Sequence, residues 1–264
     1  MTNVSKTQID RLGDRLKKRE ITESDLRMLD EFRHSFYEAY EFVISVIRKH
    51  SGLEPTGRPA KSTTSISEKL QRESIRLTQV QDIAGCRLIV SGVLEQERVV
   101  DLLASLFEHT AIIDRRATPS HGYRAVHVIV TRGEKLVEIQ VRTSYQHVWA
   151  ELSEKLSDVF DPTIKYGGGN QSHRQLLAQW SGVVQKEENV ERALAGVQQQ
   201  LAELLSQTSF SETDEATLGE LKAEIVRQEN ERVERRGSNL AAMREAIERF
   251  AKLINAGGAD AVSH

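Results

Sequence analysis

Three basic side chains and one carboxylate occur close together in the first third of the chain. Arg58, Lys61 and Lys69 lie in the segment GRPAKSTTSISEKL, which also holds hydroxyl side chains such as Ser65. Asp82 directly precedes the apolar run IAGCRLIV. Cations bind phosphate oxygens, and Mg²⁺ prefers one or two carboxylates together with phosphate oxygens. These residue types therefore predict binding of a metal–nucleotide complex.

A second polar cluster follows from the alternation of residues 123–142. Two alternating runs flank the turn TRGEK and predict an antiparallel hairpin. Side chains alternate between the two faces of a strand, so one face can be buried. That face carries Val126, Val128, Val130, Val137, Ile139 and Val141. The opposite face carries Tyr123, His127, Glu138, Gln140 and Arg142.

This polar set has two interpretations. A sheet face open to solvent is the simpler one, because antiparallel sheets commonly leave one face wet. The other is a site: if the strands that carry Asp82 and Glu138 are neighbours, these two carboxylates could hold Mg²⁺ at a triphosphate.

Several common motifs are missing from the sequence. No GxxxxGKS or GxxxxGKT segment occurs, so the usual P-loop route to a triphosphate is closed. HExxH, CxxC and GxSxG are missing as well, which excludes the corresponding zinc and serine-hydrolase templates. Phosphate binding must therefore rest on individual side chains.

Composition indicates a buried core and a well-solvated surface. Of 264 residues, 39% are hydrophobic and 28% charged, and the net charge of −3 argues against wholesale coating of nucleic acid. No apolar run reaches the roughly 18 residues of a membrane span, and the N-terminus lacks the apolar core of a signal peptide. We expect no membrane partner and a cytoplasmic location. The single cysteine, Cys86, is expected in the core.

Helices are predicted around these segments. Apolar spacing predicts two helices in residues 1–50, with Thr22 or Ser24 as the N-cap of the second. Residues 51–64 hold two prolines and two glycines and predict a loop. Further helices are expected over residues 65–77, 94–108 and 144–158.

Beyond Gly167–Gly169 the chain takes on a heptad-like rhythm, which predicts two or three long helices. The apolar positions are Val190, Leu194, Val197, Leu201 and Leu204, then Leu240, Met243, Ile247, Phe250 and Ile254. We expect these helices to pack within the chain or to join copies in a homo-oligomer, rather than to have a dedicated sensor or partner-binding role. We expect three parts: N-terminal helices over 1–50, an α/β core over 51–166 and a helical extension over 167–264.

Five motifs in fixed order carry a resemblance to a known family. GRPAKSTTSISEKL, DIAGCRLIV, HGYRAVHVIV, VEIQVRT and HVWAELSEKL cover most of residues 57–156 and resemble the RelA/SpoT synthetases of guanosine alarmones. The resemblance implies an α/β (α+β) fold with a mixed, mostly antiparallel sheet flanked by helices. It implies transfer of pyrophosphate from ATP to the 3′-hydroxyl of GDP or GTP, which makes (p)ppGpp.

The resemblance also implies roles for particular residues. Asp82 and Glu138 would be catalytic and bind Mg²⁺, and Glu138 could instead help to deprotonate the attacking hydroxyl. ATP would be bound by Arg58, Lys61, Ser65, Lys69 and Arg87. The acceptor would be bound by Tyr123, His127, Gln140, Arg142 and His121, with Tyr123 stacked on its base.

Two departures from the family pattern concern the acceptor. His121 stands where the family usually has asparagine, and Ser153-Glu154 replaces a glutamate–histidine pair. Two alternatives therefore stay open: a toxin-like enzyme that pyrophosphorylates the tRNA 3′ end, and a nucleotide-binding regulator without turnover. Basic residues that could meet tRNA lie at 17–19 and 48–49, although solvated helix faces are the better explanation for them.

Three further residues are expected to have structural roles. Arg124 is expected as a surface charge, Glu151 as a charge on a helix surface and Trp149 in the core.

Overall fold

The structure, a computed structural model, describes residues 5–207 and 212–260. These residues form two compact units. The first takes in the described residues up to 89, together with 97–114 and 126–141. The second takes in residues 90–96, 115–125 and the described residues from 142 onward. The predicted division at residues 50 and 166 stays a prediction.

The first unit begins with three helices, where the sequence predicted two. They are α1 (Lys6–Lys18), α2 (Glu23–His34) and α3 (Tyr37–Ser51). The extra break falls at Ser35, whose hydroxyl donates to the Phe32 carbonyl and so competes with the helix. Of the two predicted N-caps, Thr22 caps α2, in a reciprocal capping box with Asp25.

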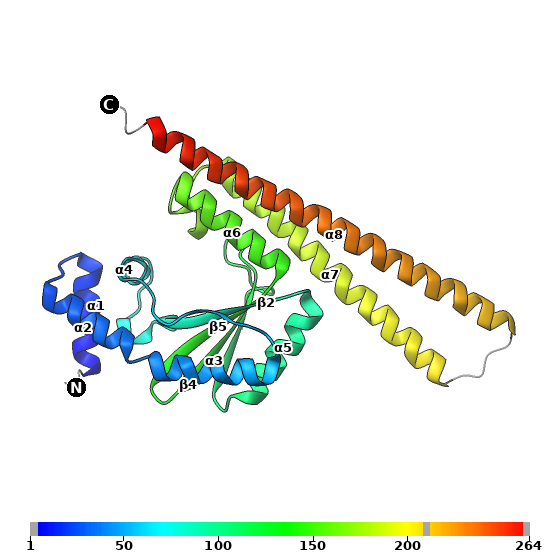
Figure 1. The fold of residues 1–264 in the computed structure, drawn as a ribbon, viewed down its shortest axis with the longest axis horizontal. Helices are drawn as coiled ribbons and strands as arrows, with labels where there is room; N and C mark the ends of the chain where they lie inside the picture. Colours follow the sequence, from blue (N-terminus) through cyan, green and yellow to red (C-terminus); the bar gives the residue numbers. More distant parts are fainter. Residues whose placement is uncertain (1–4, 208–211, 261–264) are drawn as a thin grey trace. The chain divides into compact units, whose positions relative to one another are not determined.

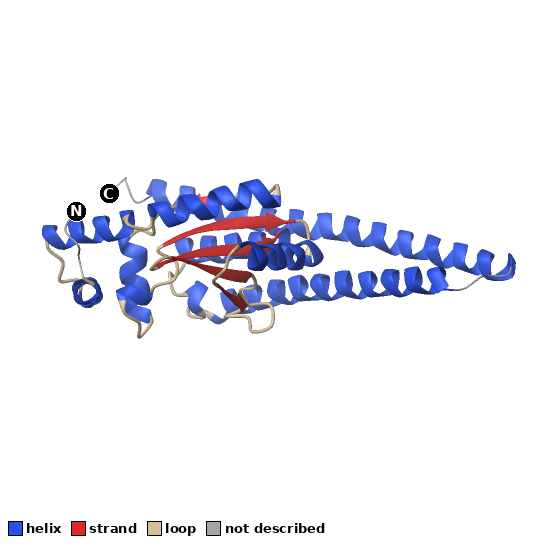
Figure 2. Ribbon diagram, turned by 90° about the horizontal axis from the view of Figure 1, so that it is seen from below, coloured by secondary structure: helices blue, strands red, loops and turns tan. Residues whose placement is uncertain are grey.

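Five strands form one sheet, drawn in red in Figure 2. They are β1 (Thr56–Arg58), β2 (Ala84–Val90), β3 (Thr110–Asp114), β4 (Val126–Arg132) and β5 (Lys135–Thr143), in the order β1-β2-β5-β4-β3. The pairs β1–β2, β3–β4 and β4–β5 are antiparallel, so the predicted fold class is confirmed. Strand β1 lies within the segment 51–64, where a loop was wrongly predicted, and β3 was not predicted.

Helices α4 (Thr63–Arg72) and α5 (Val93–Leu106) correspond to two of the helices that the sequence predicted. Helix α4 ends earlier than the predicted helix over 65–77, because the chain turns extended at Glu73. Helix α5 matches the prediction closely.

The apolar face of the hairpin is buried as predicted. Val126 pairs with Val141, Val128 with Ile139 and Val130 with Val137, and each is at most 1% exposed. On β1, Gly57 pairs with the buried Cys86, and α3 lies against it. A Cβ built on Gly57 would lie 1.6 Å from the Tyr40 hydroxyl oxygen.

The second unit is mainly helical. It contains α6 (Ser144–Val159), α7 (Gln171–Gln207) and α8 (Glu212–Asp260), and α7 and α8 run side by side in Figure 1. Trp149, Leu177, Val184 and Met243 are buried together in its core. Val197, one of the predicted heptad positions, is 46% exposed.

The side chains of Leu204, Phe250 and Ile254 lie outside the described residues, and self-association of the helices stays a prediction. Across residues 5–207 and 212–260, no helix combines the length and apolar character needed to cross a membrane.

Replacing Gly57 by alanine is expected to destabilise the protein. The new methyl group overlaps the Tyr40 hydroxyl, so the buried Tyr40 side chain, or α3 with it, must move away from β1, at a cost of about 1 to 3 kcal/mol. Gly196 in α7 is the matched control, because a Cβ there meets no atom within 4 Å. Alanine at that helical position should stabilise by about 0.5 to 1 kcal/mol. Urea unfolding measures the free energy of unfolding of both variants. A Gly57→Ala protein as stable as wild type would contradict the close packing of Tyr40 in α3 against β1.

Candidate functional site

Asp82 lies between two lysine side chains in the first unit. Its carboxylate oxygens accept hydrogen bonds from Lys61 Nζ at 2.5 Å and from Lys69 Nζ at 2.9 Å. All three side chains are mostly buried, with 12 to 20% of their surface exposed. The structure thus joins three predicted site residues in one cluster, here called the Asp82 cluster.

Positive charge outweighs negative charge in the Asp82 cluster. Burial raises the pKa of Asp82, but Lys61 and Lys69 outweigh it and lower this pKa from 3.8 to about 2. Burial is the largest influence on Lys61 and lowers its pKa, and the charges of Lys69 and Arg58 lower it further, so the pKa lies below its ordinary value although Asp82 raises it. Two lysine cations therefore pair with one carboxylate, and Arg58 adds a third positive charge near Lys61. Such an excess of positive charge is relieved when an anion binds.

The start of α4 lies at this cluster. The Ser62 hydroxyl caps the helix by accepting from the Ser65 backbone N–H at 3.2 Å. The backbone N–H of Lys61 donates to the Ile83 carbonyl at 2.7 Å, which ties the start of α4 to the approach to β2. A helix N-terminus presents unpaired N–H groups and a positive dipole end to anions. The backbone N–H groups at the start of α4 and the Lys61 ammonium group therefore lie close together, where both can bind an anion.

The strand register gathers more predicted residues on one side of the sheet. Arg58 pairs with Gly85, and His127 pairs with Gln140. Directly paired residues project to the same face. A Cβ built on Gly85 would lie 2.7 Å from the carbonyl oxygen of Glu138 and 3.5 Å from its Cβ, so β2 and β5 approach closely there. This polar face consists of Arg58, Arg87, His127, Glu138 and Gln140.

Glu138 is charged although it is buried. One of its carboxylate oxygens lies 2.9 Å from Nδ1 of His127, and the other accepts from the Gln140 amide at 2.7 Å. Burial raises the pKa of Glu138, as does the charge of Asp82, but His127 and Gln140 outweigh both. The pKa of Glu138 therefore lies below its ordinary value, and the carboxylate is ionised at neutral pH.

Asp82 and Glu138 have the chemistry of a Mg²⁺ site. Asp82 lies just before β2, not on a strand, but β2 is the neighbour of β5, which carries Glu138. The two carboxylates are close enough to repel each other. A divalent cation removes that repulsion. Within the described part of the chain, no three His, Cys, Asp or Glu side chains gather to bind a metal. Mg²⁺ commonly takes only one or two carboxylates, with water and substrate phosphate, so this pair fits it.

In the second unit, Tyr123 and Arg142 lie together. Tyr123 precedes β4, which begins at Val126, so its predicted place on the strand face is wrong. Its hydroxyl accepts a hydrogen bond from Arg142 Nη2 at 3.0 Å. The centre of its ring lies 5.2 Å from the Arg142 guanidinium and 6.3 Å from the Trp149 ring. The ring is therefore held from two sides.

The turn before Tyr123 contains His121. An isolated bridge pairs Ser120 with Tyr123 and closes the turn, and His121 takes a positive φ of 53° within it. A Cβ built on Gly167 would lie 2.3 Å from His121 Nδ1. The first glycine of the Gly167–Gly169 run thus makes room for His121.

Arg124 was wrongly expected at the surface. Its side chain is 6% exposed, and its Nη2 lies 2.6 Å from a carboxylate oxygen of Glu188 in α7. A buried guanidinium needs such a partner, and this one is 64 residues away along the chain. Trp149 is buried and Glu151 is exposed, as expected.

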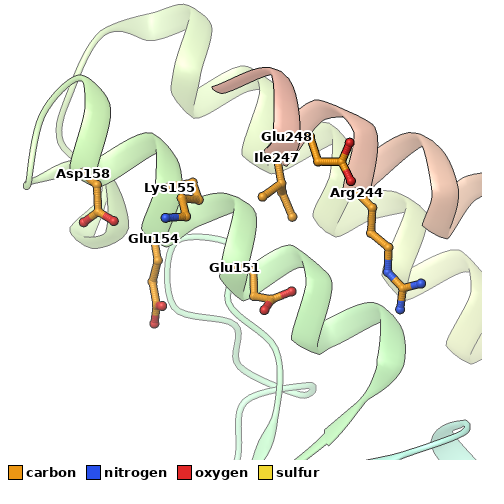
Figure 3. Close-up of a pocket in the computed structure, with 7 residues that line it drawn as sticks. All are labelled: Glu151, Glu154, Lys155, Asp158, Arg244, Ile247 and Glu248. Carbon is orange, nitrogen blue, oxygen red and sulfur yellow. The ribbon is translucent and has the colours of Figure 1, made fainter. Parts of the chain in front are cut away.

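A groove of about 360 Å³ lies between α6 and α8 in the second unit (Figure 3). Glu154, one of the departures from the family pattern, lines it, whereas Ser153 is buried. The lining residues are Glu151, Glu154, Lys155, Asp158, Arg244, Ile247 and Glu248. They include none of the predicted site residues.

The basic residues considered for tRNA lie at helix ends. They fall in or just after the last turns of α1 and α3, where cations interact favourably with the helix dipole. Lys17 donates to the Ile75 carbonyl at 2.8 Å, and Arg48 pairs with Glu54 at 2.5 Å. These contacts account for Lys17 and Arg48 without a nucleic acid.

Two residues that shape the site, Gly85 and Ser62, were not predicted from the sequence. Gly85 allows the close approach of β2 to Glu138, and a glycine inside a strand pattern is a signal of such an approach. Ser62 caps α4, and a serine directly before a helical pattern is a recognised N-cap signal.

Comparison with known proteins identifies the region that carries the five motifs. Residues 57–157 match the family model described as the region found in RelA/SpoT proteins. The chain therefore contains a RelA/SpoT-type domain, which confirms the resemblance. All the predicted site residues fall inside the matched range.

Individual relatives match over part of their length. The uncharacterized protein Rv1366 of Mycobacterium tuberculosis is 38% identical over 119 residues, which is 44% of this chain and 44% of that protein. GTP pyrophosphokinase YjbM of Bacillus subtilis is 37% identical over 134 residues, which is 45% of this chain and 60% of that enzyme. The chain thus spans about half the length of these curated relatives. The crystal structure of small alarmone synthetase 1 from Bacillus subtilis matches with a TM-score of 0.48 and 25% identity, over 68% of this chain and 100% of that one.

The stabilisation that the Asp82 cluster provides should be lost in acid. The pKa of Asp82 is about 2 in the folded chain, against 3.8 ordinarily, so folding favours the charged form. This contribution is complete above about pH 4 and is lost as the pH falls toward 2. Between about pH 5 and pH 2, wild type should lose about 2 kcal/mol more unfolding free energy than Asp82→Asn.

Urea unfolding at a series of pH values measures this difference. Glu54→Gln is the control, because its exposed pair with Arg48 should contribute little. Parallel pH profiles for wild type and Asp82→Asn would show that the lysines do not stabilise the carboxylate.

Proposed function

We propose that the chain transfers the pyrophosphate of ATP to the 3′-hydroxyl of GDP or GTP and so makes (p)ppGpp. One observation carries the proposal: two ionised carboxylates, Asp82 and Glu138, lie beside an excess of cations inside a RelA/SpoT-type domain. A carboxylate pair fits a divalent cation, and the cations fit a polyphosphate. The name of the Bacillus subtilis relative, GTP pyrophosphokinase, supports the same reaction.

On the donor side, the cations bind the triphosphate of ATP. Lys61 and Lys69 exchange their shared partner Asp82 for phosphate oxygens, which relieves the excess of positive charge. Arg58 contributes from β1, Ser65 from the first turn of α4 and Arg87 from the polar face. Attack at the β-phosphorus develops negative charge, and cations already held in place stabilise it without rearrangement.

Asp82 and Glu138 are the residues that would hold Mg²⁺. When bound, the ion neutralises charge on the phosphate oxygens. The lowered pKa of Glu138 makes it a weak proton acceptor and favours the metal-ligand role over that of general base. His127 and Gln140 keep this carboxylate ionised and oriented.

The reaction forms one bond and breaks one. The acceptor 3′-oxygen bonds to the β-phosphorus, the bond from that phosphorus to the oxygen bridging the α-phosphate breaks, AMP leaves and the hydroxyl proton is released. Tyr123 stacks on the acceptor base, with its ring held by Arg142. His121, His127 and Gln140 are assigned to the acceptor by their places in the family motifs.

Transfer of label from ATP labelled at its terminal phosphate tests the proposal. GDP, GTP, ATP and deacylated tRNA are offered separately, with Mg²⁺ or with EDTA. Label in a guanosine nucleotide, lost with EDTA, is the expected result. Label in tRNA alone would move the protein to the tRNA-modifying class. Nucleotide binding without transfer to any acceptor would contradict catalysis and favour a regulator.

Asp82→Asn and Glu138→Gln should each lower kcat by about 10²- to 10³-fold, because each removes one charge from the site at nearly constant size. Glu134→Gln is the matched control, since this carboxylate lies exposed in the turn between β4 and β5. Steady-state rates measure the effect. Wild-type rates in either site variant would refute its assigned role.

A further inference from the structure

The segment around Tyr123 is held by α7 of the helical extension. Ser181 of α7 donates a hydrogen bond to the Gly122 carbonyl at 2.8 Å. Glu188, two turns further along α7, forms the buried ion pair with Arg124. These two contacts lie on either side of Tyr123 in the sequence, so both backbone neighbours of this tyrosine are fixed by one helix.

The ion pair is built to orient its partners. Arg124 uses two nitrogens, with Nε 3.2 Å and Nη2 2.6 Å from one Glu188 oxygen. The other Glu188 oxygen accepts from the Gln146 amide at 2.8 Å, and Gln146 is in turn bonded to Gln96. A fork of two nitrogens sets direction as well as distance. A buried ion pair adds little net stability over apolar side chains of similar volume. The main effect of the Arg124–Glu188 pair is therefore to orient the Arg124 side chain.

Helix α8 holds α7 through a second set of charges. Arg232 of α8 pairs with Glu187 at 2.8 Å and with Glu191 at 3.5 Å. Glu191 also accepts from the Leu94 backbone N–H at 3.3 Å. Glu187 and Glu188 are adjacent and both buried, yet one pairs with α8 and the other with the segment that carries Tyr123.

We propose that Glu188 is a positioning residue for the acceptor nucleotide. Through Arg124 it fixes the backbone that presents Tyr123, so the helical extension sets the affinity for the acceptor and leaves the affinity for ATP unchanged. The proposal rests on the function proposed above, in which Tyr123 stacks on the acceptor base.

Glu188→Gln and Glu187→Gln form a matched pair for the test. Both remove one buried carboxylate charge from neighbouring positions of α7, but only the first leaves Arg124 without its counter-charge. In Glu188→Gln we expect KM for the acceptor to rise about tenfold or more, with KM for ATP close to that of wild type. Glu187→Gln should leave both KM values near those of wild type.

Arg124→Lys provides a second route if Glu188→Gln does not fold. This variant keeps the charge but loses the two-nitrogen fork, so the same selective rise in acceptor KM is expected. In the double variant the two effects should not add, because both act through one pair. Equal changes in the two KM values, or no change in Arg124→Lys, would overturn the proposal.

Amide hydrogen exchange separates this proposal from the proposed function. If wild type transfers no pyrophosphate, the proposed function fails. Amide exchange at residues 121–125 then still shows whether Glu188 fixes the backbone around Tyr123. Faster exchange there in Glu188→Gln than in Glu187→Gln supports the role of Glu188. Equal exchange in the two variants overturns it.

Discussion

Side chains alternate along each strand, and neighbouring strands pair in register, so the buried face of this sheet also determines its polar face. Val128 and Ile139 pair within the core, which leaves His127 and Glu138 on the opposite face. The β1–β2 register adds Arg58 to that face. A slip of one residue would expose the valines and bury the charges. Core packing and site geometry therefore depend on the same register.

Buried charges in this chain are kept ionised by partners that also organise the surrounding segments. Asp82 is ionised because Lys61 and Lys69 outweigh its burial, and in the proposed function these same lysines bind phosphate. Glu138 depends on His127 in the same way. In the second unit, the pairing of Arg124 with Glu188 links a predicted acceptor segment to a helix of the extension. Each of these contacts keeps a buried side chain charged and also holds together the two chain segments that carry the partners.

The sequence predicted most reliably those features that depend on local periodicity. The hairpin, its buried valines and the long helices followed from strict spacing. Strands β1 and β3 did not, because they lie at the sheet edges and are largely exposed, which weakens their apolar pattern. The pairing of Arg124 with Glu188 leaves no local pattern, since the partners are 64 residues apart. The polar cluster on the sheet was predictable by parity, whereas the lysine partners of Asp82 required the fold.

In the proposed function, the cations around Asp82 bind the triphosphate of ATP. Calorimetric titration with Mg²⁺ and α,β-methylene ATP tests it most directly, because this analogue cannot release AMP. Wild type should bind the analogue, and Lys61→Met should bind it at least about tenfold more weakly, since a charge-assisted contact is lost. Lys18→Met, at an exposed position in α1, should bind like wild type. Equal affinities for wild type and Lys61→Met would contradict the claim.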